Sequence, residues 1–451
     1  MFERVLKKAN PAFWVPTLYT AEGLPFVVVN VVSVLMYKSF SLMQKSKGLP
    51  EIPDRQIALF TTLVAWPWML KPFWSPFLEM FKTKKYFVVA TQFFGGICLG
   101  LLALTLGLPS YFQWSLVLFA IIAFDFATHD IAADGVYIST LSQKEQAKFV
   151  GWQGAFYNVG KVLSQGAFVI LAGYLETKIG IMDAWMVVMA MFGGFMILLS
   201  LYHVKMLPSG GVSGQVKTLK ETLDTFGDVV KTFFEKKDIW WGICFLVFYR
   251  FAEGQAIKIF PLFMRATREQ GGLGLPVEQI GVLYGVFPVI AFIVGSVLAG
   301  YFTAKRGLKR SLLTLCFFFN VPFAAYAFLA ITQPTNILVI GGAVVVEYFG
   351  YGFGFVGLIL FVMQQIAPGK YKMAHYAFGS AIIALGFNLP SMISGYLSDF
   401  LGYRNFFIWV LLATIPSFLV TWFVPFREIK EDTSTESTGE QGQLGLQENV
   451  H

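Results

Sequence analysis

Four ionisable side chains stand inside one long apolar stretch of the sequence. The segment LVLFAIIAFDFATHDIAADGVY, residues 116–137, carries Asp125, His129, Asp130 and Asp134. A charge at the centre of a membrane-spanning helix costs about 3 kcal/mol, so such residues persist only where water or a partner compensates them. A desolvated carboxyl beside a base can load and release protons, and histidine changes its charge near neutral pH. The four residues are therefore candidates for proton coupling or gating.

Helical spacing divides these four residues into two pairs. At about 100° per residue, Asp125 and His129 lie about 40° apart on a helix, as do Asp130 and Asp134. We expect the first pair to face a water-filled cavity, and the second pair to meet a neighbouring helix or Lys71. The alternative for Asp130 and Asp134 is a purely structural ion pair.

Further charged residues occur within other apolar runs. They are Glu22, Lys71, Lys161, Arg250, Glu253, Lys258 and Glu347. The three glutamates are also candidates for proton coupling or gating. Arg250 stands three residues before Glu253, so the two side chains can neutralise each other along one helix. Lys161 has no acidic residue one turn away on its own run, which favours a place in a cavity over a structural pair with Asp125.

The elements that must position these side chains are membrane-spanning helices. Of the 451 residues, 56% are hydrophobic and only 14% are charged, whereas soluble domains carry about 25% charged residues. A helix needs about 20 apolar residues to cross a bilayer. Twelve such runs follow one another: 13–37, 56–78, 86–107, 113–140, 149–175, 184–204, 239–264, 279–304, 311–331, 336–367, 373–397 and 404–426.

The placement of basic residues predicts the orientation and the division of the chain. Lys and Arg are concentrated in the two tails and in alternate loops, so the positive-inside rule places both termini in the cytoplasm. This accounts for the net charge of +7 without a nucleic-acid partner. We expect a six-helix bundle at 1–204, a cytoplasmic linker with an amphipathic helix at 205–238, a second bundle at 239–426 and a disordered tail at 427–451.

The two halves of the chain share a short sequence at equivalent positions. Ala-Glu-Gly occurs at 21–23 and again at 252–254, at similar depth in the first and seventh runs. The turn GSVLAGYFTAKRGLKRS resembles the G-x-x-x-D-R-x-G-R-R turn of the major facilitator superfamily, with Ala304 in place of the Asp. The resemblance implies an all-α membrane protein with twelve transmembrane helices in two six-helix bundles. In that fold, runs one, four, seven and ten line a central cavity, with run five beside them.

Several segments resemble one branch of that superfamily, the muropeptide permeases of the AmpG type. They are FATHDIAADGVYISTL, TAEGLPF, WMLKPFWSPFLE, VEYFGYGFGFVGLILFVMQ and AHYAFGSAIIALG, spread over most of the apolar part. Two departures from the family pattern stand out, because His129 and His375 each replace an expected Gln. These changes bear on the substrate more than on the fold.

The resemblance implies proton-driven import of anhydro-muropeptides across the bacterial inner membrane for cell-wall recycling. The peptide carboxylates of such a solute would suit the basic residues Lys161, Arg250 and Lys258. Its sugar hydroxyls and amides would suit polar and aromatic side chains, namely Tyr157, Asn158, Gln255 and Tyr348. The expected partners are an anionic glycopeptide, protons and the lipid bilayer, with the protein acting as a monomer.

Other function classes remain as alternatives. A permease or exporter for another anionic conjugate, such as an acyl-CoA-like or sugar-phosphate solute, fits the same charges. A membrane sensor without flux is a second alternative. The sequence contains no H-E-x-x-H or G-x-S-x-G motif, so we expect no catalytic residues, no metal site and no cofactor.

Overall fold

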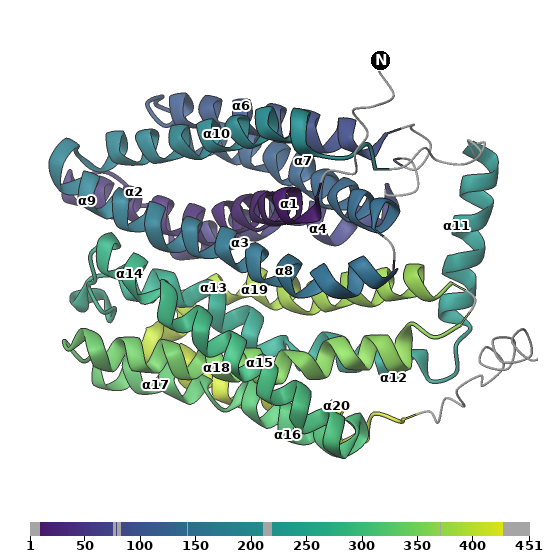
Figure 1. The fold of residues 1–451 in the computed structure, drawn as a ribbon. Coiled ribbons are helices and arrows are strands. Elements are labelled where there is room, and N and C mark those ends of the chain that lie inside the picture. Colours follow the sequence, from purple (N-terminus) through teal and green to yellow (C-terminus); the bar gives the residue numbers. More distant parts are fainter. Residues whose placement is uncertain are drawn as a thin grey trace, which may run out of the picture.

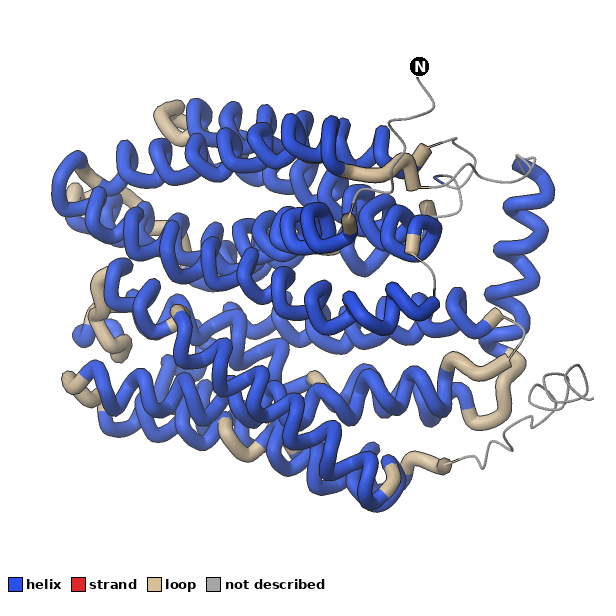
Figure 2. The backbone as a smooth tube through the Cα atoms, viewed as in Figure 1, coloured by secondary structure: helices blue, strands red, loops and turns tan. Residues whose placement is uncertain are grey.

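The computed structural model describes residues 10–74, 78, 83–141, 143–210, 219–369 and 371–426. Every regular element within these ranges is a helix (Figure 2). The predicted disordered tail at 427–451, the first nine residues and part of the predicted linker lie outside the described residues.

In the first half of the chain, each of the first six predicted runs contains helix among its described residues. Three segments, labelled η, depart from α-helical geometry: η2 and η4 are π-helical and η3 is a 3-10 helix. In chain order the elements are α1 Pro11–Val27, η2 Val28–Val32, α2 Ser33–Ser46, α3 Asp54–Leu63, α4 Pro67–Leu70, η3 Lys71–Phe73, α6 Lys84–Thr105, α7 Tyr111–Thr140, α8 Gln143–Val162, η4 Leu163–Phe168, α9 Val169–Ile179 and α10 Ile181–Met206.

The second half follows the connecting helix α11, Leu219–Phe234, which forms where the sequence predicts an amphipathic helix. Its elements are α12 Ile239–Tyr249, α13 Phe251–Arg265, η5 Arg268–Gln270, α14 Val277–Leu283, α15 Val286–Arg306, α16 Leu308–Asn320, α17 Phe323–Thr332, α18 Ile337–Phe361, η6 Val362–Ile366, α19 Lys372–Leu412 and α20 Ile415–Phe423. Here η5 is a 3-10 helix and η6 is π-helical.

Nine helical stretches of the described residues are long and apolar enough to cross a membrane. The predicted second and seventh spans fall outside this set because each is broken. Pro67 cannot donate a backbone hydrogen bond, and α3 ends before it; Arg250 leaves helical geometry between α12 and α13. The predicted eleventh and twelfth spans lie within one stretch, in which Gly402, at φ 70° and ψ 157°, marks the break between them.

The helices of the two halves stack on each other, and α11 runs crosswise along one end of both (Figure 1). We call this the terminal end, because the chain enters and leaves the bundles there, and the opposite one the distal end. The ring of Phe226 on α11 lies 6.2 Å from the ring of Phe73 in the first half and 6.2 Å from that of Phe378 in the second. The connecting helix therefore contacts both halves.

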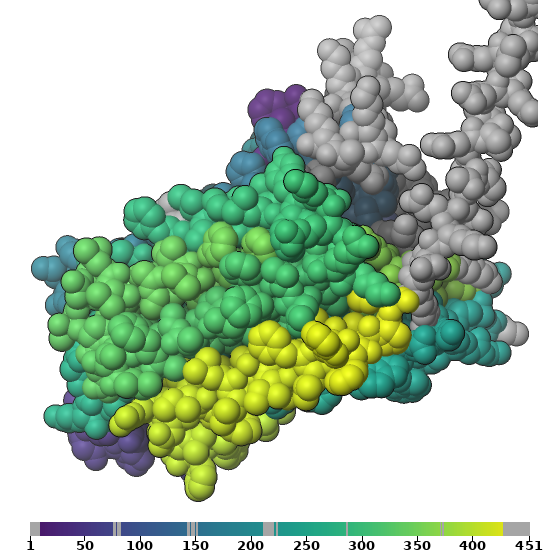
Figure 3. Space-filling view, turned by 90° about the horizontal axis from the view of Figure 1, so that it is seen from below, coloured from purple at the N-terminus to yellow at the C-terminus, as the bar shows by residue number. Residues whose placement is uncertain are grey.

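The outward surface of the bundles is apolar, as a lipid environment requires. Large hydrophobic side chains such as Phe287, Tyr301 and Phe400 are more than three-quarters exposed. In the space-filling view, the last described residues form a ridge across the face made by the second half (Figure 3). Such an apolar exterior would be costly in water, and it is ordinary for helices whose solvent is the bilayer.

The repeated Ala-Glu-Gly tripeptides hold equivalent places in the two halves. A Cβ atom added to Gly23 on α1 would lie 2.2 Å from the carbonyl oxygen of Tyr157 on α8. A Cβ added to Gly254 on α13 would lie 2.3 Å from the carbonyl oxygen of Phe387 on α19. Predicted span one thus packs on span five as span seven packs on span eleven, and the glycines permit this close approach.

Replacing Gly23 with alanine should separate α1 from α8 and destabilise the protein by about 1–3 kcal/mol, because the new methyl group overlaps a backbone carbonyl. Gly154→Ala, also on α8, is the matched control, since no atom lies within 4 Å of its added Cβ. Thermal unfolding of the purified variants measures the difference. Equal midpoints for Gly23→Ala and Gly154→Ala would contradict the packing argument.

Candidate functional site

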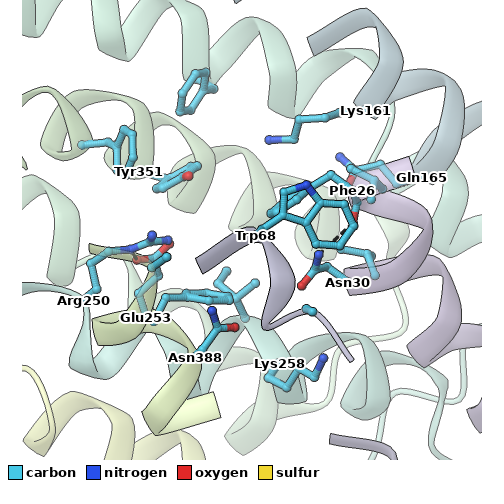
Figure 4. Close-up of a pocket in the computed structure, with 18 of the residues that line it drawn as sticks. Phe26, Asn30, Trp68, Lys161, Gln165, Arg250, Glu253, Lys258, Tyr351 and Asn388 are labelled. Carbon is cyan, nitrogen blue, oxygen red and sulfur yellow. Dashed lines mark hydrogen bonds and ion pairs between the residues drawn. The ribbon is translucent and has the colours of Figure 1, made fainter. Parts of the chain in front are cut away.

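A cavity of about 410 Å³ lies between the two halves (Figure 4). Its walls come from α1, η2, α3, α4, α8 and η4 in the first half, and from α13, α15, α18 and α19 in the second. Its volume falls in the range of about 300–1,000 Å³ that is usual for small-molecule sites. Because both halves contribute walls, any movement of one half against the other changes its shape.

The Arg250 guanidinium is already neutralised where it borders this cavity. Its Nε donates to Glu253 Oε2 at 2.5 Å, and its second terminal nitrogen donates to Glu253 Oε1 at 2.6 Å. The guanidinium also stacks near the rings of Phe387, at 4.7 Å, and Phe355, at 5.5 Å. The predicted ion pair between residues three apart is therefore confirmed, and it fixes the arginine in a bidentate geometry.

Lys161 and Lys258 present less fully compensated charges to the cavity. Neither forms an ion pair within 4 Å among the described residues, and Lys258 is only 5% exposed. The Lys161 ammonium lies 5.9 Å from the Phe292 ring and interacts at longer range with Glu347 and Glu253. The alternative partner for Lys161, Asp125, is not among the acids that it faces. Two lysine side chains thus border the cavity without a close acidic partner among the described residues.

Neutral polar and aromatic side chains complete the lining. The predicted residues Tyr157, Asn158 and Tyr348 line the cavity, as does Glu347, whose Oε2 accepts a hydrogen bond from Tyr326 at 2.9 Å. The sequence analysis missed several further lining residues: Phe26, Asn30, Trp68, Gln165 and Asn388. Three of these are amides within apolar runs, and that contrast is a signal that could have identified them.

Gln255 was predicted to bind substrate, but the structure places it elsewhere. Its side chain is fully buried, and its Oε1 accepts a hydrogen bond of 2.9 Å from the indole nitrogen of Trp409. Its Nε2 donates to the carbonyl of Phe251 at 3.3 Å. The amide is therefore occupied within the protein and does not line the cavity.

The expected cavity position of Asp125 and His129 is also wrong. No described residue of α7 lines the cavity. Asp125 and His129 instead turn toward Gly95 and Gln92 on α6. His129 is fully buried, with its Nε2 2.9 Å from Gln92 Nε2. Gln92 Oε1 in turn lies 2.8 Å from Nδ1 of His203 on α10. His129 therefore belongs to a polar contact inside the first half.

A second group of charges lies within the first half, apart from the cavity lining. Lys71 Nζ is 3.9 Å from Asp130 Oδ2, which confirms the predicted approach of Asp130 to Lys71. Tyr19 donates a hydrogen bond of 3.1 Å to Asp134 Oδ1. Glu22, which does not line the cavity, interacts electrostatically with Asp130, Asp134 and Lys71. We call Glu22, Lys71, Asp130 and Asp134 the acid cluster.

Tyr157 connects the acid cluster with the cavity. It lines the cavity and interacts electrostatically with Glu22 and Asp130. The acid cluster and the charges that line the cavity are therefore neighbouring groups.

Removing the carboxylate of Glu253 should leave a buried guanidinium without its partner. We expect Glu253→Gln to lower the free energy of unfolding by about 3 kcal/mol, and the double variant with Arg250→Gln to recover part of the loss. Glu51→Gln is the matched control, because Glu51 pairs with Lys45 at 3.5 Å and is 42% exposed. Losses that simply add in the double variant would argue against a tightly coupled pair.

Comparisons with known proteins identify the family of this chain. Residues 18–375 match the model of the Major Facilitator Superfamily. The anhydromuropeptide permease of Escherichia coli (strain K12) is 21% identical over 405 residues, covering 89% of this chain and 77% of that protein. A Rickettsia felis protein described as putative transporter AmpG 4 is 20% identical over 418 residues, covering 89% and 94% of the two chains.

Solved structures share the fold at low sequence identity. A bacterial homolog of the human lysosomal transporter Spinster, inward-facing and unoccupied, has a TM-score of 0.70 and 16% identity, covering 93% of this chain and 98% of its own. The xylose transporter XylE from E. coli, in an inward open conformation, has a TM-score of 0.62 and 14% identity, covering 97% and 99%. With a family match over most of its length and this fold, the chain belongs to the Major Facilitator Superfamily of membrane transporters.

Proposed function

We propose that this transporter imports anhydro-muropeptides, GlcNAc-anhydroMurNAc-peptides, by alternating access, with protons as the coupling ion. It would reside in the bacterial inner membrane with both termini in the cytoplasm, as the loop charges predict. The relatives named as anhydromuropeptide permease and AmpG-type transporter support the substrate class. The observation that carries the proposal is the cavity between the halves, with two lysine side chains that no described carboxylate pairs within 4 Å.

The cavity offers chemistry that suits a glycopeptide. Lys161 and Lys258 would each attract a peptide carboxylate in a site screened from bulk water, where a charge-assisted hydrogen bond is strong. Trp68 and Tyr348 would pack against sugar rings through their apolar faces. The amide of Asn158 would pair with hydroxyl or N-acetyl groups.

The halves are tied together at the distal end, which suits one state of an alternating-access cycle. Tyr403 in the second half donates a hydrogen bond to Asp54 at the start of α3. A terminal guanidinium nitrogen of Arg265, at the end of α13, lies 3.2 Å from Oε2 of Glu176 on α9. Opening the distal end requires these contacts to break, so substrate binding or protonation must favour the other state for transport to proceed.

The acid cluster is our proposed proton site. Three carboxyl groups share one lysine there, so taking up a proton relieves repulsion between like charges. Tyr157 would couple the protonation of the acid cluster to the cavity, because it lines the cavity and interacts with Glu22 and Asp130.

Reconstituted vesicles loaded with the purified protein should accumulate radiolabelled GlcNAc-anhydroMurNAc-tripeptide when the outside is made acidic. A protonophore should abolish the accumulation, because the driving gradient is then lost. Protein-free vesicles provide the control. Accumulation that survives the protonophore would contradict proton coupling, and uptake blocked only by acyl-CoA or sugar phosphates would contradict the muropeptide assignment.

Lys161→Gln should reduce this uptake at least tenfold, or about 1.4 kcal/mol in binding, while the thermal midpoint stays unchanged. The amide keeps much of the side chain's volume and removes the charge that would hold the substrate carboxylate. Lys178→Gln is the control, because Lys178 is exposed on α9, next to Tyr174. Undiminished uptake by Lys161→Gln would remove the lysine from the binding site.

A further inference from the structure

A groove of about 480 Å³ opens on the outward face of the first half, between α6 and α7 and away from the cavity. Its lining residues are Thr91, Phe94, Ala120, Ile121, Phe124, Asp125 and Thr128. Phe94 and Phe124 are 50% and 53% exposed on the surface that faces lipid. The groove is therefore reached from within the bilayer, and its walls are almost entirely apolar.

One carboxyl group stands in this apolar groove. Asp125 is 8% exposed, and its buried Oδ2 atom has no hydrogen-bond partner among the described residues. That oxygen lies against α6 at Gly95, where an added Cβ would come within 2.6 Å of it. Because Gly95 has no side chain, the carboxyl of Asp125 fits against α6. The packing of α6 on α7 therefore fixes the position of this carboxyl.

The neighbouring hydroxyl groups donate their protons elsewhere. Thr91 Oγ1 donates to the carbonyl of Phe87 at 2.7 Å, and Thr128 Oγ1 donates to the carbonyl of Phe124 at 2.9 Å. The indole N–H of Trp74 donates a hydrogen bond of 3.2 Å to Thr128 Oγ1. No described lysine, arginine or histidine lies within 4 Å of the Asp125 carboxyl either. The described hydroxyl and basic side chains around Asp125 therefore leave its Oδ2 without a donor.

The groove defines the chemistry of a donor that reaches it from the bilayer. A molecule that arrives through the hydrocarbon and fills space between phenyl rings must be largely apolar. A molecule that compensates a carboxylate at this depth must carry a cation with an N–H bond, because an uncompensated charge there costs about 3 kcal/mol. The rings of Phe94 and Phe124, which line the groove, also favour a cation.

We propose that the groove between α6 and α7 binds a lipophilic amine from the bilayer, with the Asp125 carboxylate as its counter-ion. The ammonium pairs with the part of the carboxylate that borders the groove, and the apolar part lies between Phe94, Ile121 and Phe124. The site is separate from the cavity between the halves and does not depend on the proposed transport substrate.

Binding of radiolabelled 4-phenylbutylamine to the protein in lipid nanodiscs tests the proposal, with empty nanodiscs as the background. The wild-type protein should bind the amine at least tenfold more tightly than the neutral 4-phenylbutanol. Asp125→Asn should remove that preference. Asp183→Asn, which alters an exposed aspartate at the start of α10, should keep it.

A second variant tests the groove without touching the carboxyl. Ile121→Trp fills the groove from a residue that is 39% exposed, so it should fold and should weaken amine binding at least tenfold. Equal affinity of the wild-type protein for the amine and the alcohol would overturn the proposal, even if Asp125→Asn failed to fold. Amine binding that Ile121→Trp leaves intact would also overturn it.

Discussion

The compensation of charge inside an apolar medium governs the arrangement of this protein. Arg250 and Glu253 form a bidentate pair, and Lys71 stands among three acids of the first half. Helices that carry such residues cannot turn freely toward lipid, because each exposed charge would cost several kcal/mol. Partnered charges such as these limit the rotation of the helices that carry them, and the cavity lies where Lys161 and Lys258 have no acidic partner within 4 Å among the described residues.

Interactions within one helix could be predicted from the sequence, because spacing alone determines them. The pair of Arg250 and Glu253 and the shared face of Asp125 and His129 are examples. The direction of a face depends on neighbouring helices, so the turn of Asp125 away from the cavity could not be predicted. Gln255 shows the same limit, since its partner Trp409 is 154 residues away in the chain.

The fold itself was more predictable than the site. Twelve apolar runs and a repeated Ala-Glu-Gly were enough to predict two related bundles, and the packing of Gly23 and Gly254 bears this out. The breaks at Pro67 and Arg250 make two spans irregular, and both line or border the cavity. A neutral amide such as Gln165 is less costly than a charge in an apolar run, so its sequence signal is weaker than that of Lys161.

The ion pairs that join the halves at the distal end differ in how far solvent reaches them. The pair of Arg55 and Asp399 joins the halves at 3.9 Å, with the two side chains 48% and 32% exposed, whereas the Arg265 and Glu176 side chains are 16% and 9% exposed. Mobile ions screen exposed charges at physiological ionic strength over about 8 Å, and shielded ones far less. The equilibrium between the conformations of the transporter should accordingly respond to the salinity of the medium bathing this end, with the solvent-facing pair yielding first.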